Sequence, residues 1–173
     1  FEGGQRVPTA MMWPNVIPKG KIANQLSSTI DLLPTITHIV NGSLPNHIID
    51  GINIIDVLEG KNETPRKHFY YYHKTNALEG VRKDNWKLVL PHNSRSYKGV
   101  LPKNDGHPGK YNSLKAEYAL YNLRRDPGEE YNVIDMYPDI VIEMEKLVEK
   151  ARKDMGDNLT KRKGENKRPA GRI

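Results

Sequence analysis

The side chains best placed to contact a ligand lie in the polar stretch 91–116, which is rich in Gly, Pro and Asn and contains His92, Arg95 and His107. Long loops on a rigid frame often carry binding or specificity residues. The alternative is that each histidine is a surface residue without a ligand, because a lone histidine is weak evidence for a site. His92 is the first candidate for ligand contact and His107 the second. His73, at the end of an aromatic run, is more typical of a strand end.

A second candidate group opens the chain, where Glu2 and Arg6 enclose Gly3-Gly4. An Arg–carboxylate pair that fastens this loop is the simplest interpretation, since such pairs often serve positioning. The two glycines allow close backbone packing. A phosphate-binding loop is not indicated, because no Lys-Ser/Thr pair follows.

Composition narrows the chemistry further. The absence of cysteine rules out disulfides, thiolate metal sites and a cysteine nucleophile within these 173 residues. The net charge of +6 is concentrated at one end, because residues 161–173 hold six Lys and Arg against one Glu. The rest of the chain is almost neutral, which argues against a nucleic-acid-binding body. The basic end could still bind polyanions or be a solvated tail. No apolar run approaches the length of a membrane span.

The first half of the chain predicts one strand and one helix. Val7–Trp13 is short and mostly apolar, which favours a buried strand of a parallel sheet or an extended segment that leads into one. A helix follows with Ser28 as its N-cap and Asp31 in the capping-box position. Pro34 should kink this helix or split it into two short pieces.

The second half predicts a small sheet and one long helix. Aromatic residues favour a strand over 68–73, and a hairpin turning at 83–85 joins strands over 78–82 and 86–90. Another strand is expected over 118–123, whereas 91–116 is expected to be a loop. The apolar stripe from Ile140 to Met155 predicts an amphipathic helix that Gly156 ends. Tyr70, Tyr71 and Tyr72 could stack on a sugar ring, but core packing is favoured.

This order predicts the end of an α/β domain followed by an α+β subdomain, with a small antiparallel sheet and a C-terminal amphipathic helix. We expect the last strand and kinked helix of the α/β domain over 1–58. The α+β subdomain is expected over 59–160, and a basic C-terminal tail over 161–173.

Five motifs, in order along the chain, resemble the C-terminal part of a sulfatase of the alkaline-phosphatase superfamily. They are Glu2-Gly3-Gly4-Gln5-Arg6-Val7-Pro8 with Trp13-Pro14 and Gly20; Ser28 to Thr35; Asp50-Gly51; Val81-Arg82 with Trp86-Lys87-Leu88; and Leu120 to Leu123 with Asp126-Pro127, Glu129 and Asn132. Pro91 to Tyr97, Asp105 to Gly109 and Arg168 to Gly171 are similar to arylsulfatases of the arylsulfatase-A type.

The resemblance implies an alkaline-phosphatase-like parent that hydrolyses sulfate esters with a formylglycine nucleophile and calcium. The family makes formylglycine from a Cys/Ser-x-Pro-x-Arg motif. This sequence has no such motif, and Ser43-Leu44-Pro45-Asn46-His47 has His where Arg is required. We therefore expect an inactive C-terminal fragment whose parent supplies the nucleophile and every metal ligand, so that this chain holds no catalytic residue, metal site or cofactor of its own.

The resemblance also suggests roles for the candidate residues, because a residue from this subdomain can reach the substrate pocket in arylsulfatases. His92, His107 and Arg95 are thus expected to bind substrate, and Glu2 and Arg6 to support the active site structurally. The expected partner is a sulfated small molecule or glycan, without nucleic acid or membrane, for a periplasmic or secreted parent.

The fragment should also expose apolar surface that the parent covers. The residues concerned are Val7, Ala10, Met11, Ile30 and Leu33. A dimer, a swapped assembly or a partly disordered N-terminal third of the chain is therefore expected.

Two alternatives remain open. The parent could be a phosphodiesterase or phosphonate hydrolase of the same superfamily, since related enzymes share the fold. The chain could instead be a polyanion-binding module that uses its basic tail, with strongly salt-dependent binding.

Overall fold

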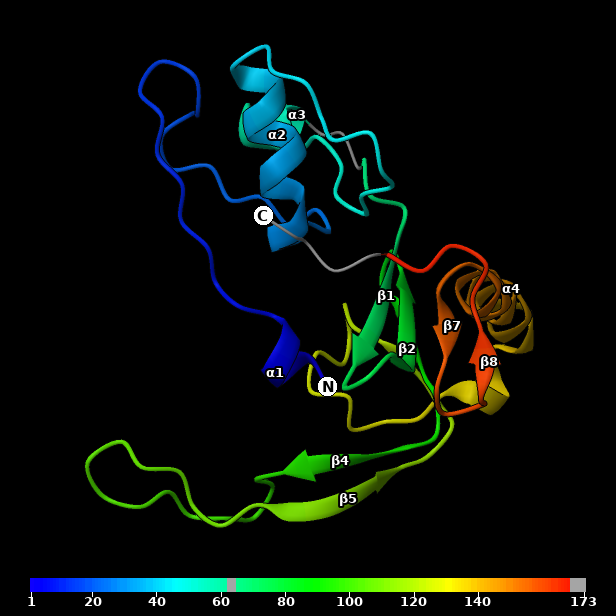
Figure 1. Cartoon of the computed structure of the whole chain (residues 1–173). Helices are drawn as coiled ribbons and strands as arrows, with labels where there is room; N and C mark the ends of the chain where they lie inside the picture. The colour runs from blue at the N-terminus through cyan, green and yellow to red at the C-terminus, as the bar shows by residue number, and fades with distance from the viewer. Residues whose placement is uncertain (62–64, 169–173) are drawn as a thin grey trace. The chain divides into compact units, whose positions relative to one another are not determined.

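The computed structural model describes residues 1–61 and 65–168 of the chain (Figure 1). It contains two compact units. Unit 1 combines Phe1–Phe69 with the stretch that begins at Lys167, and unit 2 is Tyr70–Asn166. Residues 169–173 of the expected tail, and with them most of the Arg168 to Gly171 motif, lie outside the described residues. In the described part, no helix has the length and apolar character needed to cross a membrane.

Unit 1 is built around one helix that begins as a 3-10 turn. Its elements are α1 (Glu2–Gln5), the 3-10 turn η1 (Thr29–Asp31), α2 (Leu32–Ile39) and α3 (Ile55–Leu58). Ser28 and Asp31 form the expected capping box at the start of η1. Pro34 is the third residue of α2, where a missing N–H requires no intrahelical partner. α2 therefore continues through Pro34, and the expected split at this proline is not observed; the change from 3-10 to α geometry comes earlier, between Asp31 and Leu32.

The segment Val7–Trp13, expected as a strand, has no regular secondary structure. Val7 is 67% exposed, so the apolar run is not buried in unit 1. A parallel strand depends on hydrogen bonds to a neighbouring strand. Among the described residues of unit 1 no strand pairs with this segment, which explains the difference.

Unit 2, together with the first two residues of β1, contains a four-stranded sheet of order β1-β2-β3-β6. Figure 1 labels β1 and β2 of this sheet. The strands are β1 (His68–His73), β2 (Ala77–Lys83), β3 (Trp86–Val89) and β6 (Ala119–Asn122). The pairs β2–β3 and β3–β6 are antiparallel. Asp84 adopts a φ of 52° in the tight turn between β2 and β3, as the expected hairpin requires.

The long helix α4 (Pro138–Met155) covers this sheet and follows the 3-10 turn η2 (Ile134–Met136). Its buried residues Met144, Val148 and Ala151 join one core with sheet residues Leu78, Val81, Leu88 and Leu120. Tyr70 and Tyr72 pack against the same core, so the core interpretation of these two tyrosines is confirmed. A helix packed on a small antiparallel sheet is the α+β arrangement that the sequence predicts.

The stretch expected to be a loop contains a second, two-stranded sheet. β4 (His92–Ser96) pairs antiparallel with β5 (Asn112–Ala116) and leaves 97–111 as the connecting loop. These strands are mostly polar, so they lack the apolar alternation by which a strand is found in a sequence. A third pair, β7 (Gly156–Asp157) with β8 (Arg162–Lys163), follows α4 directly.

Candidate functional site

His92, the first candidate, lies at the start of β4 with both ring nitrogens in contact with protein oxygens. Its Nδ1 is 2.6 Å from the carbonyl oxygen of Leu90, and its Nε2 is 3.2 Å from Oε2 of Glu79. The side chain is only 6% exposed. Both oxygens are acceptors, so only a ring protonated on both nitrogens donates to both of them. A substrate oxygen that reached Nε2 would have to replace Glu79.

Arg95 occupies the same strand but faces solvent. Its guanidinium carbon lies 4.8 Å from the ring centroid of Tyr111, within the range of a cation–π contact. The Tyr111 ring also meets the Tyr97 ring edge-on, with centroids 6.5 Å apart and planes at 77°. Arg95 therefore belongs to a small aromatic and cationic cluster rather than standing alone.

His107 lies in the loop between β4 and β5. The loop closes on itself, because the N–H of Lys103 donates to the His107 carbonyl at 3.0 Å and the N–H of His107 donates to the Asn104 carbonyl at 3.2 Å. Lys103, Asn104, His107 and Pro108 line an open depression of about 610 Å³. The depression is open to solvent, and Lys103 and His107 contribute to its lining.

The register of the hairpin separates these three candidates. His92 pairs with Ala116 and Arg95 pairs with Ser113. Because successive side chains on a strand point to opposite faces, Arg95 lies on the face opposite His92. His107 belongs to neither strand. One hairpin therefore carries all three residues without bringing them together at one point.

Glu2 and Arg6 are linked through the backbone, because the N–H of Arg6 donates to the Glu2 carbonyl at 2.7 Å. The side chain of Glu2 is buried at 3% exposure, whereas Arg6 is exposed. Glu2 therefore has the environment of a structural carboxylate. The role of both residues beside an active site stays a prediction.

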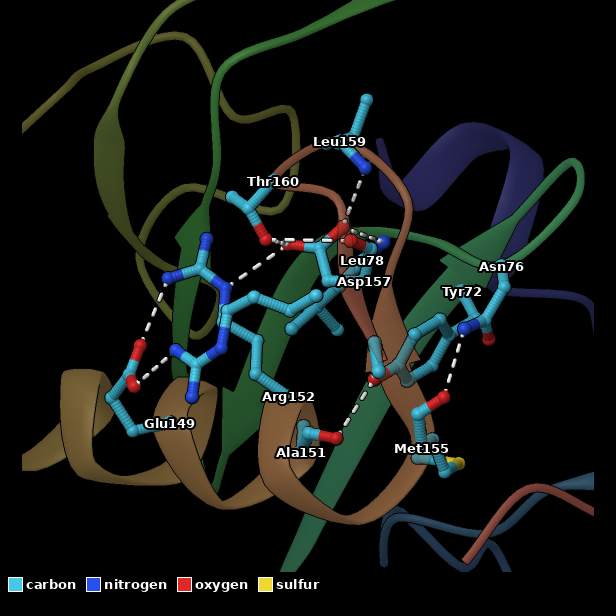
Figure 2. Close-up of polar contacts among 12 residues, drawn as sticks. Tyr72, Asn76, Leu78, Glu149, Ala151, Arg152, Met155, Asp157, Leu159 and Thr160 are labelled. Carbon is cyan, nitrogen blue, oxygen red and sulfur yellow. Dashed lines mark hydrogen bonds and ion pairs between the residues drawn. The ribbon is translucent and has the colours of Figure 1, made fainter. Parts of the chain in front are cut away.

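A buried aspartate that the sequence analysis did not single out organises the end of α4 (Figure 2). Asp157 is fully buried, and its Oδ1 accepts from the N–H groups of Leu78 at 3.3 Å and Leu159 at 2.9 Å. Its Oδ2 accepts from Arg152 Nε at 3.0 Å and from the Thr160 hydroxyl at 3.1 Å. The carboxylate thereby joins β2, α4 and the turn after β7.

Further contacts extend this cluster across the same surface of α4. Arg152 also donates to Glu149 at 3.0 Å, and Arg162 of β8 donates to the other Glu149 oxygen at 2.5 Å. These hydrogen bonds, first that of Arg162 and then that of Arg152, lower the pKa of Glu149. The Tyr72 hydroxyl lies 3.1 Å from the Ala151 carbonyl oxygen and 2.8 Å from the Gly156 carbonyl oxygen, as Figure 2 shows for the contact with Ala151.

Unit 1 has a comparable centre at Asp31, which is also fully buried. Its Oδ2 accepts from the N–H of Ser28 at 2.8 Å, and its Oδ1 accepts from the N–H of Ile52 at 3.0 Å. The guanidinium of Arg66, 9% exposed, completes the site with an ion pair and a hydrogen bond from Nε at 3.2 Å. Gly51 lies so near that a Cβ there would come within 2.0 Å of the Ile30 carbonyl oxygen. The Asp50-Gly51 motif thus serves close backbone packing.

The basic stretch that begins at residue 161 is partly committed to the fold. Arg162 bonds Glu149 within unit 2, and Arg168 pairs with Asp50 at 2.7 Å within unit 1. These two cations are already neutralised by carboxylates. This gives no support to a tail that is free to bind polyanions.

Comparison with known proteins identifies relatives over most of the chain. The family model described as "N-sulphoglucosamine sulphohydrolase, C-terminal" matches residues 1–154. Bovine arylsulfatase A is 28% identical over 147 residues, which are 83% of this chain and 29% of that protein. The N-acetylgalactosamine-6-O-sulfatase of Bacteroides thetaiotaomicron is 28% identical over 153 residues, 86% of this chain and 28% of that protein. The chain thus spans less than a third of these relatives.

Solved structures of sulfatases share the fold of this chain. The PsFucS1 sulfatase from Pseudoalteromonas sp. aligns with a TM-score of 0.62 at 18% identity, over 80% of this chain and 28% of that one. BT4656, solved in complex with D-glucosamine-2-N,6-O-disulfate, aligns with a TM-score of 0.54 at 25% identity. That alignment covers 82% of this chain and 27% of the other.

Proposed function

Because this chain belongs to the N-sulphoglucosamine sulphohydrolase C-terminal family of sulfatase domains, we propose that it forms part of a longer enzyme that hydrolyses sulfate esters. The observation that carries the proposal is the family match over residues 1–154. The relatives named above are sulfatases, and each is more than three times as long as the part of it that aligns with this chain. The expected substrates are aryl or carbohydrate sulfates.

Family resemblance assigns the chemistry to a formylglycine nucleophile and calcium, and the residues of this chain do not fit either group. The sequence has neither cysteine nor a Ser-x-Pro-x-Arg motif. Within residues 1–61 and 65–168, no three His, Asp or Glu side chains gather as a metal site would require. We therefore assign both groups to the remainder of the longer protein and derive no step through them here.

The role that we assign to this chain is to position substrate-facing residues on a rigid frame. The buried Asp31 and Asp157 clusters fix the loops around α2 and α4. Unit 2 presents the β4–β5 hairpin from its sheet. His92, Arg95 and His107 on that hairpin remain the proposed substrate contacts. Glu2 and Arg6 remain proposed supports of the active site. A periplasmic or secreted location is part of the same proposal.

Sulfate release by the longer protein tests the proposal. The purified protein is assayed with an aryl sulfate, with a sulfated monosaccharide and with an aryl phosphodiester as the matched alternative. We expect inorganic sulfate from at least one sulfate ester and much slower phosphodiester cleavage. The reverse preference would reject a sulfatase in favour of the phosphodiesterase or phosphonate hydrolase alternative.

A further inference from the structure

One face of the β4–β5 hairpin combines aromatic rings, cations and small polar groups. In the register of the two strands, Arg95 pairs with Ser113 and Asn93 pairs with Lys115. Extending the register by two residues sets Tyr97 against Tyr111, and their rings are in edge-to-face contact. Alternation along each strand puts the side chains of Asn93, Arg95, Ser113 and Lys115 on one face. The contact of Arg95 with the Tyr111 ring, and of that ring with Tyr97, adds the two flanking tyrosines to this face. We call this set, Asn93, Arg95, Tyr97, Tyr111, Ser113 and Lys115, the hairpin platform.

The platform is open to solvent. Tyr97 is 48% exposed and Tyr111 is 49% exposed, and the other four residues are exposed as well. On the opposite face of β4, His92, Ser94 and Ser96 are half-buried. On β5 the opposite face is buried at Ala116 but exposed at Asn112 and Leu114, so it is partly covered by protein. Within the described residues, core packing does not account for these two half-exposed rings.

The charge of the hairpin favours an anionic partner. Residues 92–116 contain five Lys and Arg but one Asp and no Glu. Lys98 pairs with Glu130 at 2.7 Å, and Lys115 lies 3.6 Å from Glu117 with both side chains exposed. The guanidinium of Arg95 contacts a ring instead of a carboxylate. A stacked guanidinium retains its N–H donors for an oxyanion in its plane.

We infer that the hairpin platform binds a sulfated oligosaccharide, with a sugar ring against Tyr97 and Tyr111 and a sulfate group at Arg95. Aromatic faces pack against the C–H surface of a sugar ring, and a planar guanidinium suits the oxygens of a sulfate. The inference rests on the proposed function and makes it more specific, because a small aryl sulfate is too short to use such an extended surface. A sulfated glycan is then the substrate class.

Binding by the full 173-residue chain tests the platform, with a heparin-derived tetrasaccharide as the probe. Its chemically desulfated form and a single-stranded DNA oligonucleotide of equal charge are the comparison ligands. Titration calorimetry gives the affinities, and backbone amide shifts locate the contact. We expect the sulfated tetrasaccharide to bind most tightly and to shift the amides of 93–97 and 111–115. Equal binding of the DNA would overturn the glycan assignment, and equal binding of the desulfated form would overturn the role of the sulfate.

Variants separate the platform from general charge. Arg95→Gln should weaken tetrasaccharide binding about tenfold, as the loss of one charge-assisted hydrogen bond does. Tyr111→Ala should weaken it about fivefold, whereas Tyr111→Phe should retain most of it. Lys146→Gln on the exposed face of α4 and Tyr131→Ala, at a residue 73% exposed elsewhere in unit 2, are the matched controls. Equal effects of platform and control variants would refute the inference.

The outcomes for the platform and for the proposed function can be told apart. Tetrasaccharide binding that persists while the longer protein releases no sulfate would remove the proposed function and leave the platform. Sulfate release without tetrasaccharide binding to the chain would remove the platform alone.

Discussion

At the residue scale, two fully buried aspartates each connect separate segments within one unit. Asp31 gathers backbone donors from two loops of unit 1, and Asp157 does the same in unit 2. Each carboxylate also meets one arginine, Arg66 or Arg152. A buried charge with this many donors is satisfied, and it becomes costly only when a partner is removed.

Replacing Asp157 by Asn should therefore destabilise unit 2 strongly. The change removes the negative charge that Arg152 contacts. It also replaces one carboxylate oxygen, which accepts hydrogen bonds, by an amide group that donates them and would face other donors. We expect a loss of about 3 kcal/mol in the free energy of unfolding, as for breaking a buried ion pair. Urea denaturation followed by circular dichroism measures it. Asp135→Asn, at an exposed site in η2, is the control and should change stability by less than about 0.5 kcal/mol. Equal stabilities of the two variants would contradict the assigned role of Asp157.

The two aspartates differ in how far their contacts can be predicted from the sequence. Asp31 was predicted as a capping residue because its partner Ser28 is three positions away and the pattern is local. Its partner Arg66 lies 35 residues on, and Asp157 bonds Leu78 across 79 residues. Contacts at such separations depend on the tertiary fold, so neither could be found from local patterns.

At the element scale, α4 and the β2–β3 hairpin were predicted because their signals are local and strong. The helix has an apolar stripe with Pro138 at its start and Gly156 at its end, and the hairpin has a turn of typical composition. β4 and β5 were missed because they are polar and are recognised by pairing with each other. The candidates His92 and Arg95 were found by residue type, but their opposite faces follow only from the strand register.

The contact of β1 with the end of α4 should weaken at alkaline pH. Burial, then the charge of Asp154, raises the pKa of Tyr70 to about 12. Burial, then the charge of Asp157, raises the pKa of Tyr72. A raised folded-state pKa means that the folded form holds its proton longer than the unfolded form, so stability falls as pH rises past the ordinary tyrosine value of about 10.

The free energy of unfolding, measured from about pH 8 to about pH 12, should show this decline. Tyr72→Phe cannot ionise at that position, so its stability should fall less steeply over the same range. The variant should start lower at neutral pH, because it lacks the hydroxyl contacts with the Ala151 and Gly156 carbonyls. Tyr131→Phe, at a highly exposed residue, should show the same dependence of the unfolding free energy on pH as the unmutated chain. Parallel curves of stability against pH for Tyr72→Phe and for the unmutated chain would count against this explanation.

At the scale of the whole molecule, unit 1 exposes an apolar face. Along η1 and α2, Ile30 is 43% exposed, Leu33 51%, Ile36 56% and Val40 65%. Spacings of three and four residues put these side chains on one side of the helix. In the longer protein this face is expected to be covered, and in the isolated chain a second copy is the available partner.

The 173-residue chain should therefore self-associate in solution. Sedimentation velocity over a range of concentrations should reveal a dimer or a swapped assembly. Leu33→Lys should shift the equilibrium toward monomer, because it places a charge in the apolar face. Ile142→Lys, at a residue of α4 that is 52% exposed, is the matched control and should leave association unchanged. If the unmutated 173-residue chain is monomeric at every concentration, the expectation is refuted.

The central claim is that this chain is a sulfatase C-terminal domain that depends on the remainder of a longer protein for its chemistry. Release of inorganic sulfate from an aryl sulfate and from a sulfated monosaccharide tests it most directly. It is measured side by side for the purified 173-residue chain and for the longer protein with and without a calcium chelator. We predict release by the longer protein, its loss with chelator, and none by the chain. Turnover by the chain itself would contradict the account.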